Sequence, residues 1–214
     1  DGLGDLVEFV GNNSELKHLD LRENASLSYE SSREVMAKML PSLEVVSGVP
    51  VSQIRDNKIT ELNLKDKGIG DFGGCIAVDL LHRNTSITSL SLMGVGLGAW
   101  AIPGIVLFFK ASKVLTSIDI RGNNFDLAHG FEVMAALGGR RTEIESFSLV
   151  PLAAMMRGEV VELALRASVI GPCEIAIVCE AIRDNSSVKV LDLSENGYPG
   201  AEAIVRLTEA LKTS

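Results

Sequence analysis

The chain has 214 residues, of which 46% are hydrophobic and 22% are charged, with six prolines. This composition excludes wholesale disorder and is sufficient for one domain with a sizeable core. The net charge of −8 argues against a surface built to grip nucleic acid. The most apolar helical segment, residues 99–112, is too short to cross a bilayer, so we expect no membrane span.

The three cysteines, Cys75, Cys173 and Cys179, have no CxxC spacing and lie in segments with helical periodicity. We therefore interpret them as buried thiols and expect neither a zinc site nor a disulfide framework. The histidines stand in unrelated contexts. The sequence thus predicts no metal and no other cofactor, and an intracellular, cytoplasmic location.

Short segments with alternating apolar residues recur along the chain, and we expect each to contain a strand. From Leu62 onward, their first core residues follow one another at intervals of 28, 28, 29, 16 and 28 residues. The predicted strand segments are 16–24, 59–67, 87–95, 115–123, 144–152, 160–168 and 188–196, with first core residues Leu19, Leu62, Leu90, Ile118, Phe147, Leu163 and Leu191.

Stretches with helical periodicity lie between these segments. Ile76, Leu80 and Leu81, for example, fall at i, i+4 and i+5 and predict one buried stripe. The order strand, turn, helix and parallel strand is typical of a curved α/β solenoid. The predicted helices cover 32–40, 72–84, 99–112, 131–139, 173–185 and 201–212.

A longer repeat is superimposed on this pattern. Three pairs of core residues are 101 residues apart, and a fourth pair is 99 apart. The pairs are Val46 and Phe147, Leu62 and Leu163, Leu90 and Leu191, and Leu19 and Ile118. We interpret 1–214 as one domain of about eight repeats in two copies, a first unit (about 16–114) and a second unit (about 115–214). Neither end resembles a polar cap, so we expect a larger chain or assembly.

An LxxLxL motif followed by Asn, a glycine-rich turn and an Ala- and Leu-rich helix recurs at a step of 28 or 29 residues. This pattern resembles the leucine-rich repeats of the ribonuclease-inhibitor-like type, as in ribonuclease inhibitor, the Ran GTPase-activating protein and NOD-like receptor sensor regions. The resemblance covers nearly the whole chain. It implies a horseshoe with parallel strands on the concave face and helices on the convex face. No functional residue of the Ran activator has a match in this sequence.

Asparagine is expected to support the turns of this pattern. Asn24, Asn123 and Asn196 close their strand turns, where a side-chain amide can satisfy backbone groups. Asn84 and Asn185 begin N-x-S/T sequences just before a strand. We attribute these sequences to turn chemistry rather than to glycosylation.

Residues between the core leucines are expected to face the concave side, because side chains alternate along a strand. Basic residues recur there at equivalent places in both units, so the face is either a set of mutually neutralised charges or a partner-binding surface. One predicted column is Asp20, Ser47, Asn63, Ser91, Asp119, Ser148, Ala164 and Asp192, and the next is Arg22, Val49, Lys65, Met93, Arg121, Val150, Arg166 and Ser194. The candidate binding residues are Asp20, Arg22, Lys65, Asp119, Arg121 and Arg166.

The predicted helix over 99–112 is apolar nearly all round, and Lys110 is its only charge. Such a helix is covered on both sides, either by a partner or by ordinary burial within the chain. A second candidate binding patch is therefore Trp100, Ile102, Phe108 and Phe109.

These features predict a non-enzymatic scaffold that binds a protein partner. Two alternatives stay open. One is a structural or accessory subunit of a large intracellular assembly. The other is a GTPase-activating regulator, which rests on fold analogy alone. The basic residues are scattered without interleaved aromatics, so we expect no nucleic-acid binding.

Overall fold

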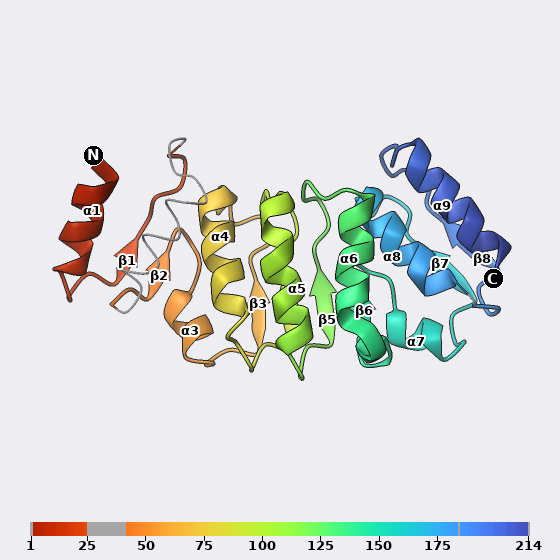
Figure 1. The fold of residues 1–214 in the computed structure, drawn as a ribbon, viewed down its shortest axis with the longest axis horizontal. Helices are drawn as coiled ribbons and strands as arrows, with labels where there is room; N and C mark the ends of the chain where they lie inside the picture. Colours follow the sequence, from red (N-terminus) through yellow and green to blue (C-terminus); the bar gives the residue numbers. More distant parts are fainter. Residues whose placement is uncertain (1, 25–41, 184, 214) are drawn as a thin grey trace.

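A computed structural model describes residues 2–24, 42–183 and 185–213 of the chain. Within these residues, short strands alternate with helices along an elongated molecule whose two ends lie far apart (Figure 1). Helices α4 (Gly70–Leu81), α5 (Ile102–Ala111) and α6 (Leu127–Leu137) stand side by side in front of the strands. The architecture is therefore mixed α/β, as predicted.

Every strand pairs in parallel with its neighbour in the sheet, which confirms the predicted direction. The strands are β1 (His18–Leu19), β2 (Val45–Val46), β3 (Glu61–Asn63), β4 (Ser89–Ser91), β5 (Ser117–Asp119), β6 (Ser146–Phe147), β7 (Glu162–Ala164) and β8 (Val190–Asp192). The other helices are α1 (Gly2–Gly11), α3 (Val51–Arg55), α7 (Leu152–Met156), α8 (Pro172–Ile182) and α9 (Ala201–Lys212), with 3₁₀ turns η1 (Ala99–Ala101) and η2 (Gly138–Thr142). The helix predicted over 32–40 lies outside the described residues.

The register of the strands follows the predicted core residues. Leu62 pairs with Leu90, Leu90 with Ile118, and Ile118 with Phe147. Each of these residues is the second residue of its strand, so their side chains leave the sheet on the same side. The result is one apolar column beneath the helices.

The sheet is interrupted twice, giving three separate sheets, β1–β2, β3–β6 and β7–β8. Each interruption follows a strand of only two residues, β2 or β6. Directly after β2, the backbones of Val46 and Val49 exchange two hydrogen bonds of 3.0 and 2.8 Å. After β6, Phe147 and Val150 do the same at 2.9 and 2.8 Å. These tight turns lead the chain away into α3 and α7 before a longer strand can form.

The prediction of the concave columns is wrong at these two turns. Four residues expected on the open face are buried, Ser47, Val49, Ser148 and Val150. Both serines adopt φ of 48°. The Oγ of Ser47 accepts a hydrogen bond of 3.1 Å from the Leu21 N–H, and that of Ser148 accepts one of 3.3 Å from the Ile120 N–H. The serine hydroxyls therefore complete the backbone bonding of the preceding strand turn.

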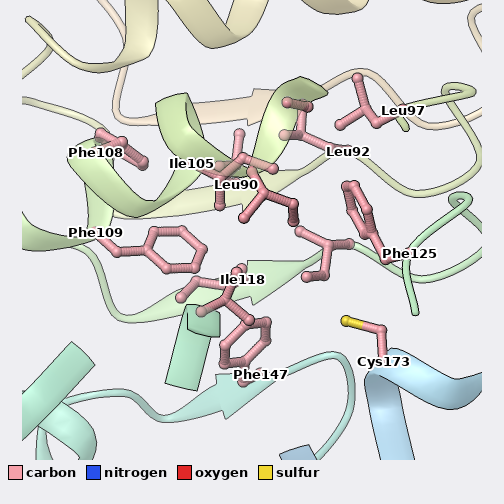
Figure 2. Close-up of a cluster of buried hydrophobic side chains, with 14 of the residues drawn as sticks. Leu90, Leu92, Leu97, Ile105, Phe108, Phe109, Ile118, Phe125, Phe147 and Cys173 are labelled. Atoms are coloured by element: carbon pink, nitrogen blue, oxygen red, sulfur yellow. The ribbon is translucent and has the colours of Figure 1, made fainter. Parts of the chain in front are cut away.

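One hydrophobic cluster extends through the described residues from Val10 to Ala210. In its centre, core residues of successive strands lie beneath α5, and the rings of Phe109 and Phe147 meet edge to face at 5.7 Å (Figure 2). The three cysteines are buried, as predicted. Burial raises the pKa of the Cys179 thiol to about 11.

Two glycines allow the helices to pack closely. A Cβ atom on Gly104 of α5 would collide with the side chain of Val78 in α4. A Cβ atom on Gly130 of α6 would collide with the Cys173 carbonyl oxygen in α8. Glycine is required at both positions because these helix backbones approach each other too closely for a larger residue.

A buried asparagine, Asn84, and a partly buried one, Asn185, satisfy backbone groups of the loops that precede β4 and β8. The Nδ2 of Asn84 donates to the Ile54 carbonyl oxygen at 2.7 Å, and its Oδ1 accepts from the N–H groups of Ser86 and Ile87 at 3.0 and 2.9 Å. Asn185 makes the same three kinds of contact 101 residues later. The nitrogen that a glycan would occupy is thus part of the fold, which confirms the interpretation as turn chemistry.

Replacing Asn84, which is 2% exposed, should therefore be costly. We expect Asn84→Ala to lower the free energy of unfolding by about 2–4 kcal/mol, because buried backbone groups lose their partners. Urea denaturation measures this loss. The exposed Asn12→Ala serves as the control, with an expected change within about 0.5 kcal/mol. Equal stabilities of the two variants would contradict the assignment.

Candidate functional site on the strand face

The basic residues predicted for the concave face are all paired with carboxylates of the same chain. Arg121 binds Asp119 through two hydrogen bonds, Nε to Oδ1 at 2.9 Å and Nη2 to Oδ2 at 2.7 Å. Arg22 binds Asp20 in the same way, with a shortest distance of 2.6 Å. Bidentate pairs of this kind are among the stronger charge-assisted contacts. The hydrogen bonds to the carboxylates raise the pKa of both arginines.

The other two predicted basic residues make single contacts that are exposed to solvent. Lys65 lies 3.8 Å from the carboxylate of Asp66, and Arg166 pairs with Glu195 across neighbouring turns. All four of these side chains are about half exposed or more. Pairs in that setting contribute little to stability because solvent and salt screen them. The structure thus brings the predicted residues together as neutral pairs rather than as one basic patch.

Arg22 and Arg121 also reach across the interruptions of the sheet. Arg22, after β1, donates from Nη1 to the carbonyl oxygen of Lys67, after β3, at 3.1 Å. Arg121, after β5, donates from Nη1 to the carbonyl oxygen of Ser168, after β7, at 2.7 Å. Each arginine therefore spans the two-residue strand that ends its sheet. We call these two side chains the braces.

The two braces differ in their exposure to solvent. The side chains of Arg22 and Asp20 are 40% and 55% exposed, whereas those of Arg121 and Asp119 are 11% and 22% exposed. Arg121 is thus a buried internal contact and is withdrawn from any binding surface. Of the predicted basic residues, Arg22, Lys65 and Arg166 stay accessible.

The apolar helix is largely assigned to the core. Ile102, Phe108 and Phe109 of α5 are all buried, so they present no exposed patch. Figure 2 shows Phe109 directed toward Ile118 and Phe147. The all-round apolar character of α5 is explained by cover within the chain, since α4 and α6 flank it and the strands lie beneath it. Trp100, in η1, is partly buried against the same cluster.

Sequence reasoning missed the exposed apolar side chains on the strand side of the second unit. Leu149, Val161 and Val169 are 46%, 59% and 51% exposed. The residues 101 positions earlier are glycine or threonine, namely Gly48, Thr60 and Gly68. An alignment of the two units would have revealed these replacements. Leu149 was hidden because its spacing from Phe147 matches that of a core residue.

Two of these side chains stand on strained backbone. Leu149 has a φ of 70° and Val169 has a φ of 59°, in the left-handed region. That region costs an L-residue roughly 1–2 kcal/mol, and a β-branched residue is rare there. Gly48 and Gly68 occupy the same region, with φ of 81° and 57°, without this cost. The second unit therefore keeps half-exposed apolar side chains where glycine would be more stable.

Leu149 and Val169 stand at positions that adjoin the brace in one unit or the other. A Cβ atom on Gly48 would lie 4.0 Å from the Nη1 of Arg22, and Leu149 is the equivalent of Gly48 in the second unit. The Cγ1 of Val169 lies 3.7 Å from the Cβ position of Gly122, the residue after Arg121. The Nη2 of Arg121 itself lies 3.6 Å from the Sδ of Met93.

Protein-family models gave no match to the chain, and no curated protein matched its sequence. Among solved structures, the tropomodulin C-terminal domain of Caenorhabditis elegans is similar at 13% sequence identity. The match covers 100% of this chain and 93% of that one, with a TM-score of 0.31. A similarity at this level carries no argument about function.

Two further properties of the described residues were assessed. None of the helices that they form combines the length and the apolar character needed to cross a membrane. The same residues contain no group of three or more His, Cys, Asp or Glu side chains placed to hold a metal ion.

Substitutions in α5 test the assignment of its aromatic residues to the core. We expect Phe109→Ala to lower the free energy of unfolding by about 3–5 kcal/mol, because it leaves a cavity against Phe147. Leu107→Ala, on the same helix but at a side chain that is 57% exposed, should change it by less than about 1 kcal/mol. Urea denaturation of both variants provides the comparison. Similar small losses of unfolding free energy in both variants would contradict the assignment of Phe109 to the core.

Proposed function

We propose that the chain is a leucine-rich-repeat horseshoe that acts as a non-enzymatic protein-interaction module. The parallel strands, the aligned core columns and the helices in a second layer support the horseshoe. The recurrence of elements supports the duplication, since β3 and β7, and likewise β4 and β8, begin 101 residues apart. A rigid array of this kind offers an extended surface to a protein partner.

The observation that carries the proposal is the set of half-exposed apolar side chains on the second unit, Leu149, Val161 and Val169. Two of them stand at positions where glycine would relieve backbone strain. They add little to the hydrophobic core at this exposure, so core packing alone does not explain why they are kept. Apolar side chains that become fully buried on association are a major source of binding energy.

The charges around these residues indicate the chemistry of the partner. Arg121 forms an ion pair with Asp119 and donates a hydrogen bond to the carbonyl oxygen of Ser168, and Arg166 is paired with Glu195. These basic side chains of the described residues are therefore compensated by carboxylates of the same chain. We propose that this surface takes an apolar segment of a protein, with Arg166 and Glu195 at the polar rim. Binding should then depend weakly on salt.

A variant that restores the residues of the first unit tests this function. We expect Leu149→Gly combined with Val161→Thr and Val169→Gly to fold with equal or higher thermal stability, because the two glycines relieve strain. The same variant should lose the partners that the parent chain captures in an extract of the native source, measured by crosslinking and quantitative mass spectrometry at low and high salt.

Leu107→Thr provides the matched control, since it removes an equally exposed apolar side chain from the helical side. This control should capture the same partners as the parent chain. Equal capture by the strand-side variant would contradict the proposal. Loss of capture by both variants would point to a different surface.

A further inference from the structure

We propose that the chain bends at the two interruptions of its sheet and that the braces restrain this bending. We further propose that the first interruption opens more readily than the second. This inference goes beyond the proposed function and does not rest on it, because it concerns the free chain. It is carried by the strand pairing, the contacts of the two arginines and the difference in their surroundings.

The interruptions are the places where strand-to-strand bonding is missing. Within the described part of the chain, no backbone hydrogen bond joins β2 to β3 or β6 to β7, whereas all other consecutive strands are bonded. Local regions with fewer hydrogen bonds open at lower free energy than the bonded sheet around them. On the strand side, Arg22 spans the first interruption and Arg121 spans the second.

The surroundings make the second brace stronger than the first. The Arg121 side chain is 11% exposed and lies 3.6 Å from the Sδ of Met93, whereas that of Arg22 is 40% exposed. We infer that Leu149 and Val169 add to the shielding of Arg121, because the equivalent positions beside Arg22 are Gly48 and Gly68. A shielded ion pair is screened by salt much less than an exposed one. The hydrogen bond to the carbonyl oxygen across the interruption is also shorter for Arg121, 2.7 Å against 3.1 Å.

A second carboxylate adds to this difference. Glu174 is buried at the start of α8, where it accepts a hydrogen bond of 3.0 Å from the Gly171 N–H. It lies close enough to Arg121 to raise the pKa of that guanidinium, after the larger effect of Asp119. The residue 101 positions earlier is Gly73, which has no charge. Arg22 also has a second carboxylate nearby, that of Glu23, but Glu23 is exposed to solvent whereas Glu174 is buried.

The consequence is a molecule whose β1–β2 end is adaptable and whose part from β3 to β8 is fixed. Bending at the first interruption changes the angle between β1–β2 and the central sheet. The strands from β3 to β8 keep their arrangement, because the second interruption stays closed. Salt should therefore loosen the first interruption selectively.

Distances between spin labels test this directly. Lys113 lies between the two interruptions and is exposed, as are Glu15 on one side and Lys189 on the other. Labels on Glu15→Cys and Lys113→Cys span the first interruption, and labels on Lys113→Cys and Lys189→Cys span the second. The native cysteines are buried, which favours labelling at the introduced sites.

We expect the distance distribution across the first interruption to broaden when NaCl rises from about 0.1 M to about 1 M, which shortens the Debye length from about 10 Å to about 3 Å. The distribution across the second interruption should stay unchanged. Broadening of both distributions to the same extent would overturn the proposed difference between the braces.

Two variants test the arginine brace and the neighbouring apolar side chains separately. Arg121→Met should broaden the distribution across the second interruption at low salt and accelerate amide exchange at Ile120 about tenfold, a factor that corresponds to about 1.4 kcal/mol. Leu149→Gly with Val169→Gly, which leaves the brace in place, should make the second interruption as salt-sensitive as the first.

Arg157→Met is the matched control. Arg157 pairs with Glu159 in the same unit, but both side chains are 55% exposed and the pair spans no interruption. It should alter neither distribution. A second interruption that stays narrow and salt-insensitive in the Leu149→Gly, Val169→Gly variant, with an unchanged cooperative melt, would refute the role of the two apolar side chains.

Discussion

The fold depends on the alignment of apolar side chains between neighbouring strands. Leu62, Leu90, Ile118 and Phe147 stand in one register, so each is covered by the next and all are covered by the helices. Strands of two or three residues have too few hydrogen bonds to persist alone. A shift of one residue in any strand would turn its apolar side chains toward solvent. The shared column therefore determines both the pairing and the side on which the helices lie.

Where this alignment is interrupted, polar side chains take over the bonding of the backbone. Ser47 and Ser148 serve the strand turns before them, and Asn84 and Asn185 serve the short connections. The arginine braces then link carbonyl groups that no strand reaches. Each of these polar side chains has a counterpart in the other unit, 99 or 101 residues away. The two-residue strand and the polar side chains that bond the backbone around it thus recur together in both units.

The sequence predicts the strands and their parallel direction well, because spacing alone determines which leucines can share a core. It predicts burial less well. The 16-residue connections give no sign that Ser47 and Val49 turn inward, since that depends on a tight turn with a left-handed residue. The apolar segment of α5 is compatible with cover by a partner or by its own neighbours, and only the three-dimensional packing distinguishes them. The exposure of Leu149 is not evident from the sequence, because this residue matches the spacing of a core residue in the motif while standing outside the core.

The same residues of the second unit are proposed to stiffen the second interruption and to contact a protein partner. In the arrangement that we propose, Leu149 and Val169 shield the Arg121–Asp119 pair while about half of each side chain stays exposed. A surface that is already fixed loses less conformational freedom when a partner binds, so more of its apolar contact energy is retained as affinity. Backbone strain at these two positions is then compatible with selection, because the same side chains stiffen the surface and supply its apolar contact. The first interruption, with glycine at both positions, lacks this combination, and we propose that β1 and β2 adjust their angle to the central sheet there.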